Sequence, residues 1–340
     1  MKLAVVLFNL GGPDSLQAVE PFLQNLFSDP AILGVPAMVR KPLARLIARR
    51  RAPLARAIYE KIGGRSPILE ETRKQAAALE AALLAKGYTA RVFVAMRCWR
   101  PFSDEVVAAV KAWAPDSIVL APLYPQHSTT TTQSSLADWD RAAQNAKLST
   151  PTNRVCCYPW DAGFVGAVAD VIRQALARRR ADVAYRLLFS AHGLPERTIA
   201  KGDPYRWQVE QTAKAIVDAL SLGGLDWKVC YQSRVGPLKW IGPSTDAEVR
   251  RAGADGKGVV VAPIAFVSEH SETLVELDIE YAHLARETGV PDYIRVPTVG
   301  HHAAFIEGLA GLVSAAALGQ SPVTCGEGRI CPRMFARCGY

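Results

Sequence analysis

The chain has 340 residues, of which 49% are hydrophobic and 21% are charged, and its formal net charge is +8. This composition is typical of a folded chain of about two domains and excludes a disordered chain, a collagen-like repeat or a disulfide-rich miniprotein. No apolar run reaches the ~18 residues that a membrane-spanning helix needs. The first residues also lack the cleavage pattern of a signal peptide, so we expect a cytoplasmic protein.

Short apolar runs alternate with amphipathic helical patterns along the chain, as is typical of parallel sheets covered on both faces. In the first half we expect strands at residues 3–8, 91–96, 118–123 and 154–158, and helices at residues 70–84 and 104–113. In the second half we expect strands at residues 186–191, 228–232, 259–265 and 293–296, and helices at residues 165–177, 273–285 and 302–318.

Eight strands divide into two groups of four, with a boundary near residues 151–160. We therefore predict an α/β fold of two Rossmann-like, doubly wound domains at residues 1–155 and 156–340, each with a four-stranded parallel sheet. Ligands of such sheets bind beyond the carboxyl ends of the strands. Neither G-x-G-x-x-G nor a Walker A sequence follows a strand, so we expect no nucleotide cofactor and disfavour a nucleotide-dependent oxidoreductase.

Most of the excess positive charge lies in residues 40–58, where apolar residues interleave with basic ones. The basic side chains of this segment are Arg40, Lys41, Arg45, Arg49, Arg50, Arg51 and Arg56. The pattern fits a solvated helix face, or a surface for anionic headgroups or an anionic substrate. No nucleic-acid-binding motif accompanies it, so we expect no nucleic-acid partner.

Imidazole and carboxylate side chains follow two of the predicted strands. His192 comes directly after the strand at residues 186–191, and His270 follows the strand at residues 259–265. Glu272, Glu276 and Glu280 then recur at i, i+4 spacing and form one helical stripe. This combination suits transient binding of a divalent cation, or removal of protons.

Seven cysteines in a cytoplasmic chain predict free thiols or metal ligands instead of disulfides. Four of them lie in or beside apolar runs, where thiols of the core are common: Cys98, Cys156, Cys157 and Cys230. The other three lie in a tail rich in glycine and arginine, which has little apolar patterning: Cys325, Cys331 and Cys338.

Seven motifs, taken in order, resemble those of the ferrochelatases, which insert Fe²⁺ into protoporphyrin IX at the last step of haem synthesis. The motifs are NLGGP at residues 9–13, KIGGRSPI at 61–68, LYPQ at 123–126, SAHGLP at 190–195, GDPY at 202–205, YQSRVGP at 231–237 and ETLVELDIEY at 272–281. The resemblance extends from about residue 3 to residue 310. It implies a lyase of two Rossmann-like domains with porphyrin in the cleft between them.

The resemblance also implies roles for the polar residues after the strands. His192 matches the active-site histidine, as proton acceptor, ligand of the substrate Fe²⁺ or both, and Glu272 matches its carboxylate partner. An unperturbed imidazole has a pKa near ~6.5 and accepts a proton at cellular pH. The residues of the implied acidic path are Glu269, His270, Glu276 and Glu280.

Six further residues match positions that line the porphyrin pocket or its mouth: Leu10, Arg97, Ser128, Thr130, Trp240 and Phe266. The guanidinium of Arg97 would suit a propionate of the porphyrin. Cys98 departs from the family pattern, since many relatives have tyrosine there. Residues of about 30–65 match the lip of the active-site mouth, which favours peripheral association of the 40–58 segment with the inner membrane.

Some ferrochelatases hold a [2Fe–2S] cluster on tail cysteines and one internal cysteine. The spacing of Cys325, Cys331 and Cys338, with Cys156 or Cys157, resembles that of certain bacterial relatives. Four thiolates are what such a cluster needs, so the resemblance implies this cofactor.

Alternatives within the same fold are a coproporphyrin ferrochelatase and a cobalt chelatase acting on a corrin precursor. An alternative of another class is a carrier that binds porphyrin or metal without catalysis. The presence of both His192 and Glu272 argues against a carrier. We expect protoporphyrin IX and Fe²⁺ as the partners, and the sequence does not indicate an oligomeric state.

Overall fold

The computed structural model describes residues 1–234, 236–319 and 322–340. The chain forms two compact units: residues 1–157, 309–324 and 339–340 make the first, and residues 158–308 and 325–338 make the second. The first change of unit thus lies two residues after the predicted boundary at residue 155. The sequence analysis assigns everything beyond that boundary to the second domain, whereas residues 309–324 and 339–340 belong to the first unit.

The first unit contains a parallel sheet with the strand order β2-β1-β3-β4-β9. Its strands are β1 (Lys2–Asn9), β2 (Thr89–Met96), β3 (Ser117–Pro122), β4 (Thr152–Cys157) and β9 (Val323–Thr324). The four strands predicted for this half are confirmed, but a sheet of four is wrong. The additional strand, β9, joins β4 through the register pairs Val155–Val323 and Cys157–Thr324, and its two residues are too short a run for a sequence pattern.

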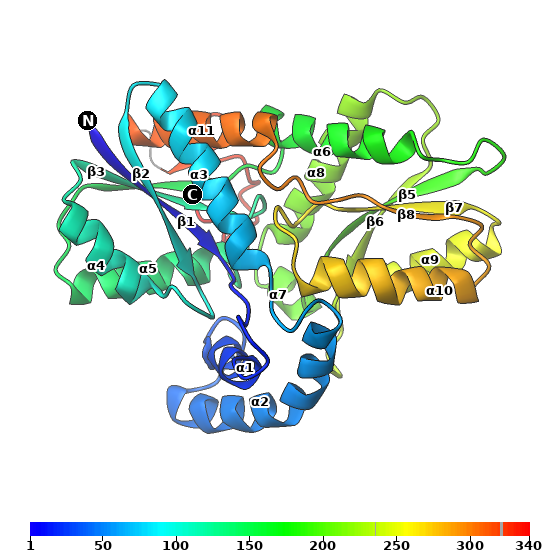
Figure 1. Ribbon diagram of the computed structural model, residues 1–340, viewed down its shortest axis with the longest axis horizontal. Coiled ribbons are helices and arrows are strands. Elements are labelled where there is room, and N and C mark those ends of the chain that lie inside the picture. The colour runs from blue at the N-terminus through cyan, green and yellow to red at the C-terminus, as the bar shows by residue number, and fades with distance from the viewer. Residues whose placement is uncertain (235, 320–321) are drawn as a thin grey trace. The chain divides into compact units, whose positions relative to one another are not determined.

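Helices cover this first sheet because the strand residues that point to each of its two faces are apolar. Buried residues of β1, β2 and β3 pack against Val107 and Val110 of α4 (Ser103–Trp113) and against Trp139 of α5 (Thr132–Asn145). Helix α3 (Ile68–Ala85) contacts β1 and β2 and buries Leu79 and Leu83 completely. Figure 1 shows these helices around β1.

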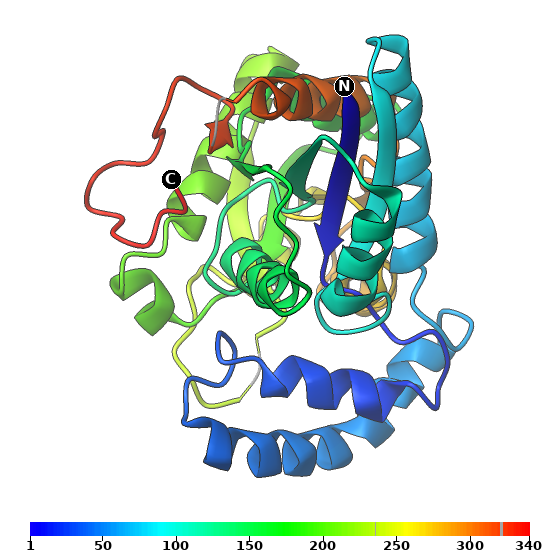
Figure 2. The same ribbon diagram turned by 90° about the vertical axis from the view of Figure 1, so that its left-hand side faces the viewer.

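Two further helices of the first unit form a hairpin, α1 (Val19–Ser28) and α2 (Ala37–Glu60), which lie side by side in Figures 1 and 2. Three buried alanines at i, i+4 spacing, Ala44, Ala48 and Ala52, form one stripe along α2. These small side chains let α2 pack closely on α1. The basic segment predicted at residues 40–58 therefore lies within α2.

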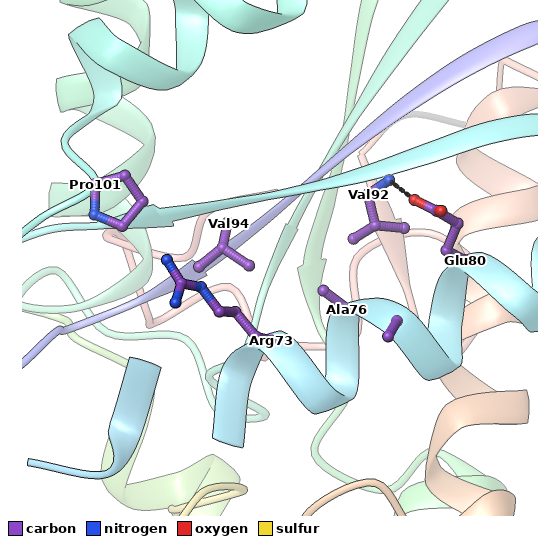
Figure 3. Close-up of a pocket in the computed structure, with 7 residues that line it drawn as sticks. Arg73, Ala76, Glu80, Val92, Val94 and Pro101 are labelled. Atoms are coloured by element: carbon purple, nitrogen blue, oxygen red, sulfur yellow. Dashed lines mark hydrogen bonds between the residues drawn. The ribbon is translucent and has the colours of Figure 1, made fainter. Parts of the chain in front are cut away.

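One edge of the first sheet is β2, and a pocket separates it from α3 (Figure 3). Arg73 and Ala76 of α3 line the pocket together with Val94 of β2. Within it the carboxylate of Glu80 accepts a hydrogen bond from the backbone N–H of Val92 at 2.7 Å. None of the predicted site residues lines this pocket.

The second unit contains a four-stranded parallel sheet with the order β6-β5-β7-β8. Its strands are β5 (Tyr185–His192), β6 (Trp227–Gln232), β7 (Gly258–Pro263) and β8 (Tyr293–Arg295). All four strands predicted for this half are confirmed. Helices α6 (Ala162–Leu176) and α8 (Tyr205–Leu220) lie on one side of the sheet, and α9 (Thr245–Ala254) and α10 (Tyr281–Glu287) on the other (Figure 1).

The helix predicted at residues 273–285 differs from the structure in kind. Its first part, η1 (Glu272–Glu280), is a π-helix, and only the continuation in α10 is α-helical. Side chains from neighbouring strands satisfy backbone carbonyls of η1: Gln232 donates to the Glu272 oxygen at 3.0 Å, and Tyr293 donates to the Leu277 oxygen at 2.7 Å. The two donors belong to β6 and β8, which are distant in sequence, so the apolar period of residues 273–285 does not reveal the π-helix.

The remaining helices are α7 (Glu196–Ala200) and α11 (Ala303–Ala317), the latter beginning in the second unit and ending in the first. Among the described residues, no helix combines the length and the apolar character needed to cross a membrane.

Candidate active site

The candidate site of the second unit lies where β5, β6 and β7 end. His192 is the last residue of β5 and stands in register with Gln232, the last residue of β6. Gly193 follows and donates its backbone N–H to the Gln232 carbonyl at 2.9 Å. A Cβ on Gly193 would lie 2.9 Å from that oxygen and 3.3 Å from the Trp240 ring, so the close approach requires glycine.

His192 and Glu272 form the central pair of the site. The Nδ1 atom of His192 lies 2.7 Å from Oε2 of Glu272. Burial by itself lowers the pKa of His192, but the charge of Glu272 and the hydrogen bond between them raise it above its usual value. Burial likewise raises the pKa of Glu272, and the nearby His192 lowers it well below its usual range. Each member of the pair therefore favours the charged form of the other: Glu272 favours imidazolium over imidazole at His192, and His192 favours carboxylate over carboxylic acid at Glu272.

Two residues at the end of β6 connect Glu272 to Glu276. The Ser233 hydroxyl lies 2.9 Å from Oε2 of Glu272 and 2.7 Å from Oε2 of Glu276. The side-chain amide of Gln232 donates to Oε2 of Glu276 at 2.8 Å. Ser190 of β5 fixes that amide by donating to Oε1 of Gln232 at 2.8 Å.

The three glutamates that the sequence places in one stripe have different environments in the structure. Burial, together with the charge of Glu272, raises the pKa of Glu276 to about 7. Glu280 ends the π-helix and is exposed. The stripe thus runs from the ion-paired Glu272 through a half-buried carboxyl that titrates near neutral pH to a carboxylate in solvent.

Two aromatic residues, Phe266 and Trp240, lie close to the candidate site. The rings of Phe266 and His270 are 4.6 Å apart, and burial lowers the pKa of His270 below its usual value. Among the described residues, Nδ1 of His270 has no hydrogen-bond partner. Trp240 forms an isolated β-bridge with Pro195, three residues after His192. The Phe266 ring therefore lies beside His270, and the Trp240 ring lies near Gly193, the residue that follows His192.

Glu269 has a different environment from the other acidic residues. Arg295 of β8 binds Oε1 of Glu269 at 2.5 Å, and the backbone N–H of Thr298 donates to the same oxygen at 2.9 Å. Burial raises the pKa of Glu269, but the Arg295 charge and these hydrogen bonds lower it below its usual value. Glu269 is thus half of a buried ion pair, whereas the sequence analysis assigns it to an open acidic path.

The predicted pocket residues of the first unit follow β1, β2 and β3. Leu10 is half-buried and packs against the cluster formed by α1 and α2. Arg97 binds the buried Asp29 at 3.0 Å and Ser134 at 2.7 Å, so its charge is already balanced within the unit. Ser128 is buried, and its hydroxyl lies 2.9 Å from that of Thr130.

The cysteines fall into both units. The side chain of Cys331 is buried, and its sulfur accepts a hydrogen bond from the Gln208 amide at 3.0 Å. Gly339, which follows Cys338, lies in the first unit against Cys156, where a Cβ would fall 3.2 Å from the Cys156 sulfur. Within residues 1–234, 236–319 and 322–340, no three histidine, cysteine or acidic side chains are grouped as metal ligands.

Sequence reasoning missed Ser233, Gln232 and Arg295. The first two end or follow a predicted strand, so the rule that ligands bind at the carboxyl ends of strands points to them. Arg295 carries no such signal, because its partners lie 17 and 26 residues away in sequence.

A family model described as ferrochelatase matches residues 2–317. The ferrochelatase of Caulobacter vibrioides is 55% identical over 95% of this chain and 92% of its own length. That of Phenylobacterium zucineum is 55% identical over 99% of this chain and 98% of its own. That of Pelagibacter ubique is 49% identical over 92% and 91%.

Two solved structures with the same fold are distant from this chain in sequence. The sirohydrochlorin chelatase SirB from Bacillus subtilis, in complex with cobalt, has a TM-score of 0.56 at 12% identity and covers 94% of this chain and 97% of its own. A second SirB structure, with Fe³⁺, has a TM-score of 0.55 at 13% identity and covers 95% and 99%. This likeness confirms the α/β fold with two parallel sheets.

Proposed function

This chain belongs to the ferrochelatase family, which inserts iron into porphyrin for haem synthesis, and we propose that it acts as a lyase on Fe²⁺ and protoporphyrin IX through His192 and Glu272. The observation that carries this assignment is the 2.7 Å contact between the two side chains at the end of β5. An imidazole that can accept a proton, beside a carboxylate that can bind a divalent metal, suits this reaction.

The reaction replaces two pyrrole protons by one Fe²⁺, so the enzyme must accept two protons and supply a partly dehydrated metal. A pocket shaped for a bent porphyrin exposes the nitrogen lone pairs and favours the transition state over the flat substrate. We propose that Fe²⁺ contacts His192 and Glu272 as it enters the ring. The lone pair of a neutral His270, whose pKa is lowered, supplies a further contact.

Glu272 raises the pKa of His192 above its usual value, so the imidazole is a stronger base than usual toward a pyrrole proton. Glu272 is a weak base, since its pKa is lowered. Glu276, with a pKa of about 7, is able to take up and release protons at neutral pH. We therefore propose that protons pass from His192 and Glu272 to Glu276, and leave by the exposed Glu280.

Six side chains are proposed to contact porphyrin: Leu10, Arg97, Ser128 and Thr130 of the first unit, and Trp240 and Phe266 of the second. Support for the last two is the position of Trp240 near Gly193 and of Phe266 beside His270. For Arg97 we propose hydrogen bonding to porphyrin instead of a net charge attraction, since Asp29 already neutralises its guanidinium.

The experiment that tests the function is anaerobic Fe²⁺ insertion into protoporphyrin IX, followed as loss of porphyrin fluorescence, for wild type and His192→Ala. We expect turnover in wild type and a loss of at least about 100-fold in the variant, because base and ligand are removed together. His301→Ala, at an exposed histidine, is the control. Porphyrin binding without turnover in wild type would favour a carrier, and preference for coproporphyrin or Co²⁺ would favour those alternatives.

We also propose that the chain binds a [2Fe–2S] cluster through Cys325, Cys331, Cys338 and Cys156. The four thiols have the donor chemistry that the cluster needs. The contact of Gly339 with Cys156 supports Cys156 over Cys157 as the internal ligand. The cluster would crosslink the tail, and no step of iron insertion passes through it.

The cluster is tested by visible absorption, iron and sulfide content and electron paramagnetic resonance of protein purified without oxygen after iron-replete expression. We expect Cys331→Ser and Cys156→Ser to lose the signals and the matched Cys157→Ser to keep them. Colourless wild-type protein would contradict the cofactor, and loss with Cys157→Ser alone would move the internal ligand to that residue.

Finally, we propose that α2 rests on the cytoplasmic face of an anionic membrane. Its large exposed hydrophobic side chains are Met38, Val39, Leu46 and Leu54, with Met38 90% and Leu54 66% exposed. They lie on the same helix as the seven basic residues, a combination that favours anionic lipid surfaces. Glu20 of α1 pairs with Arg49 and Arg56, which leaves most of the positive charge available.

Co-sedimentation with vesicles tests this surface. We expect binding to vesicles with anionic lipid, weaker binding at high salt, and loss of binding in the double variant Met38→Ser with Leu54→Ser. Leu84→Ser, at a leucine of α3 that is 52% exposed, is the matched control. Equal binding of the double variant and the control would contradict the proposal.

A further inference from the structure

Ser233 has an unusual backbone conformation for its residue type. Its φ angle is +62°, in the left-handed region that glycine adopts readily and other residues avoid. Ser233 follows directly on the last residue of β6. Strain of this kind at the end of a strand is often associated with function, because the surrounding structure must hold the residue there.

This conformation directs the Ser233 hydroxyl between two carboxylates. The oxygen lies 2.9 Å from Oε2 of Glu272 and 2.7 Å from Oε2 of Glu276. A serine hydroxyl has one hydrogen, so it donates to one of these two oxygens at a time. The three groups, followed by His192 at 2.7 Å from Glu272, then form one continuous hydrogen-bonded chain.

The neighbouring Gln232 does not replace this link. Its amide contacts the side chain of Glu276 but reaches only the backbone oxygen of Glu272. Among the described residues, the Ser233 hydroxyl is the group that hydrogen-bonds to side-chain oxygens of both Glu272 and Glu276. Without it, Glu272 loses the hydrogen bond that fixes its carboxylate toward His192 from the side of β6.

We propose that Ser233 is a positioning residue for iron insertion, whose hydroxyl holds Glu272 and Glu276 in one hydrogen-bonded chain that ends at His192. The left-handed backbone is the means by which the end of β6 delivers the hydroxyl to this place. The inference rests on the proposed roles of the two glutamates. It adds a residue that touches neither porphyrin nor iron and acts through the carboxylates.

Two variants separate the hydroxyl from the backbone. Ser233→Ala removes the hydroxyl and keeps the cost of the left-handed conformation, whereas Ser233→Gly removes both. We expect kcat to fall about 10- to 100-fold in both, as for other small displacements of catalytic groups. The KM for porphyrin should stay near the wild-type value, and the Tm of Ser233→Gly should lie within about 2 °C of wild type.

Ser221 provides a matched control in the same unit. It is also a serine with positive φ, +53°, but it is exposed, and among the described residues its hydroxyl donates to the Asp218 carbonyl alone. Ser221→Gly should leave kcat unchanged. A double-mutant cycle adds a measurement that a merely structural role would not change. In a Glu276→Gln background, Ser233→Gly should decrease kcat by a much smaller factor than it does in wild type.

Wild-type turnover in the same assay tests the function separately from this inference. If wild type is active and Ser233→Gly keeps the wild-type kcat, the positioning role is wrong although the function stands. The role would also be overturned if Ser233→Gly decreased kcat by the same factor in wild type and in the Glu276→Gln background. A decrease in kcat with unchanged Tm and KM, absent from Ser221→Gly, supports it.

Discussion

Arg295 of β8 binds both carboxylate oxygens of Asp278 in the π-helix, with Nε–Oδ1 and Nη2–Oδ2 distances of 2.7 and 2.6 Å. Such bidentate pairs fix both distance and orientation. The same guanidinium binds Glu269, which precedes the helix by three residues. Arg295 therefore connects the entrance of η1 to its middle and holds the segment that carries Glu272 and Glu276.

We expect Arg295→Met to destabilise the protein by about 3–5 kcal/mol, because it leaves a buried carboxylate without its partner. In wild type the lowered pKa of Glu269 contributes stability above its unfolded-state pKa, and this is lost as pH falls. In the variant, burial raises that pKa and only the hydrogen bonds from Thr273 and Thr298 still lower it, so we expect the pKa to rise and stability to be lost as pH rises. Urea unfolding should thus show a larger deficit at pH 7 than at pH 4.

The control for this prediction is Arg286→Met, at an exposed arginine of α10. It should change the free energy of unfolding by less than about 0.5 kcal/mol. A deficit of Arg295→Met that is the same at both pH values would show that Glu269 does not depend on this arginine.

The pH dependence of turnover should report Glu276. Its pKa is raised to about 7, so the carboxyl becomes ionised, and able to accept a proton, as pH rises through that value. We expect kcat to increase over this interval in wild type, and Glu276→Gln to lose the inflection together with part of the rate. An unchanged pH profile in the variant would exclude Glu276 as the group that titrates.

Glu272→Gln should impair insertion more than porphyrin binding. Glutamine keeps the shape of the side chain but removes the charge that raises the pKa of His192. We expect kcat to fall at least about 10-fold, with the Kd for porphyrin, measured by fluorescence, unchanged. Glu287→Gln, at an exposed glutamate of α10, is the control. Lost affinity with a normal maximal rate would instead assign Glu272 to the pocket wall.

Gly193→Ala should decrease both stability and turnover. A methyl group there would meet the Gln232 carbonyl at 2.9 Å, so β5 and β6 must separate where they present His192 and Gln232. We expect a loss of about 1–3 kcal/mol in the free energy of unfolding and a lower kcat. Gly166→Ala, in α6 with no atom within 4 Å of the new Cβ, should be neutral or slightly stabilising.

The sequence predicts the parallel strands well because each is a short apolar run between helical patterns. It also points to His192 and Glu272, since both follow a strand and carry titratable groups. The two-residue strand β9 has no such signal, because its pairing with β4 depends on a chain segment more than 160 residues away.

Contacts between distant side chains are what the sequence does not reveal. The expected pairing of Arg97 with a propionate requires that the Arg97 charge be available. Asp29, 68 residues earlier in the sequence, neutralises that charge. The π-helix is hidden for the same reason, since Tyr293 and Gln232 supply the hydrogen bonds to its carbonyls. A local period of apolar residues cannot distinguish it from an α-helix.

The hydrogen bond from Val92 to Glu80 bears on how the protein behaves at high concentration. An exposed strand edge offers rows of N–H and C=O groups to which a second chain can add, and this is a common start of aggregation. On β2, Glu80 occupies the N–H of Val92 and the carbonyl of Pro101 occupies that of Met96. At the other edge, β9 offers only two residues. The first sheet is therefore protected at both edges against intermolecular strand addition.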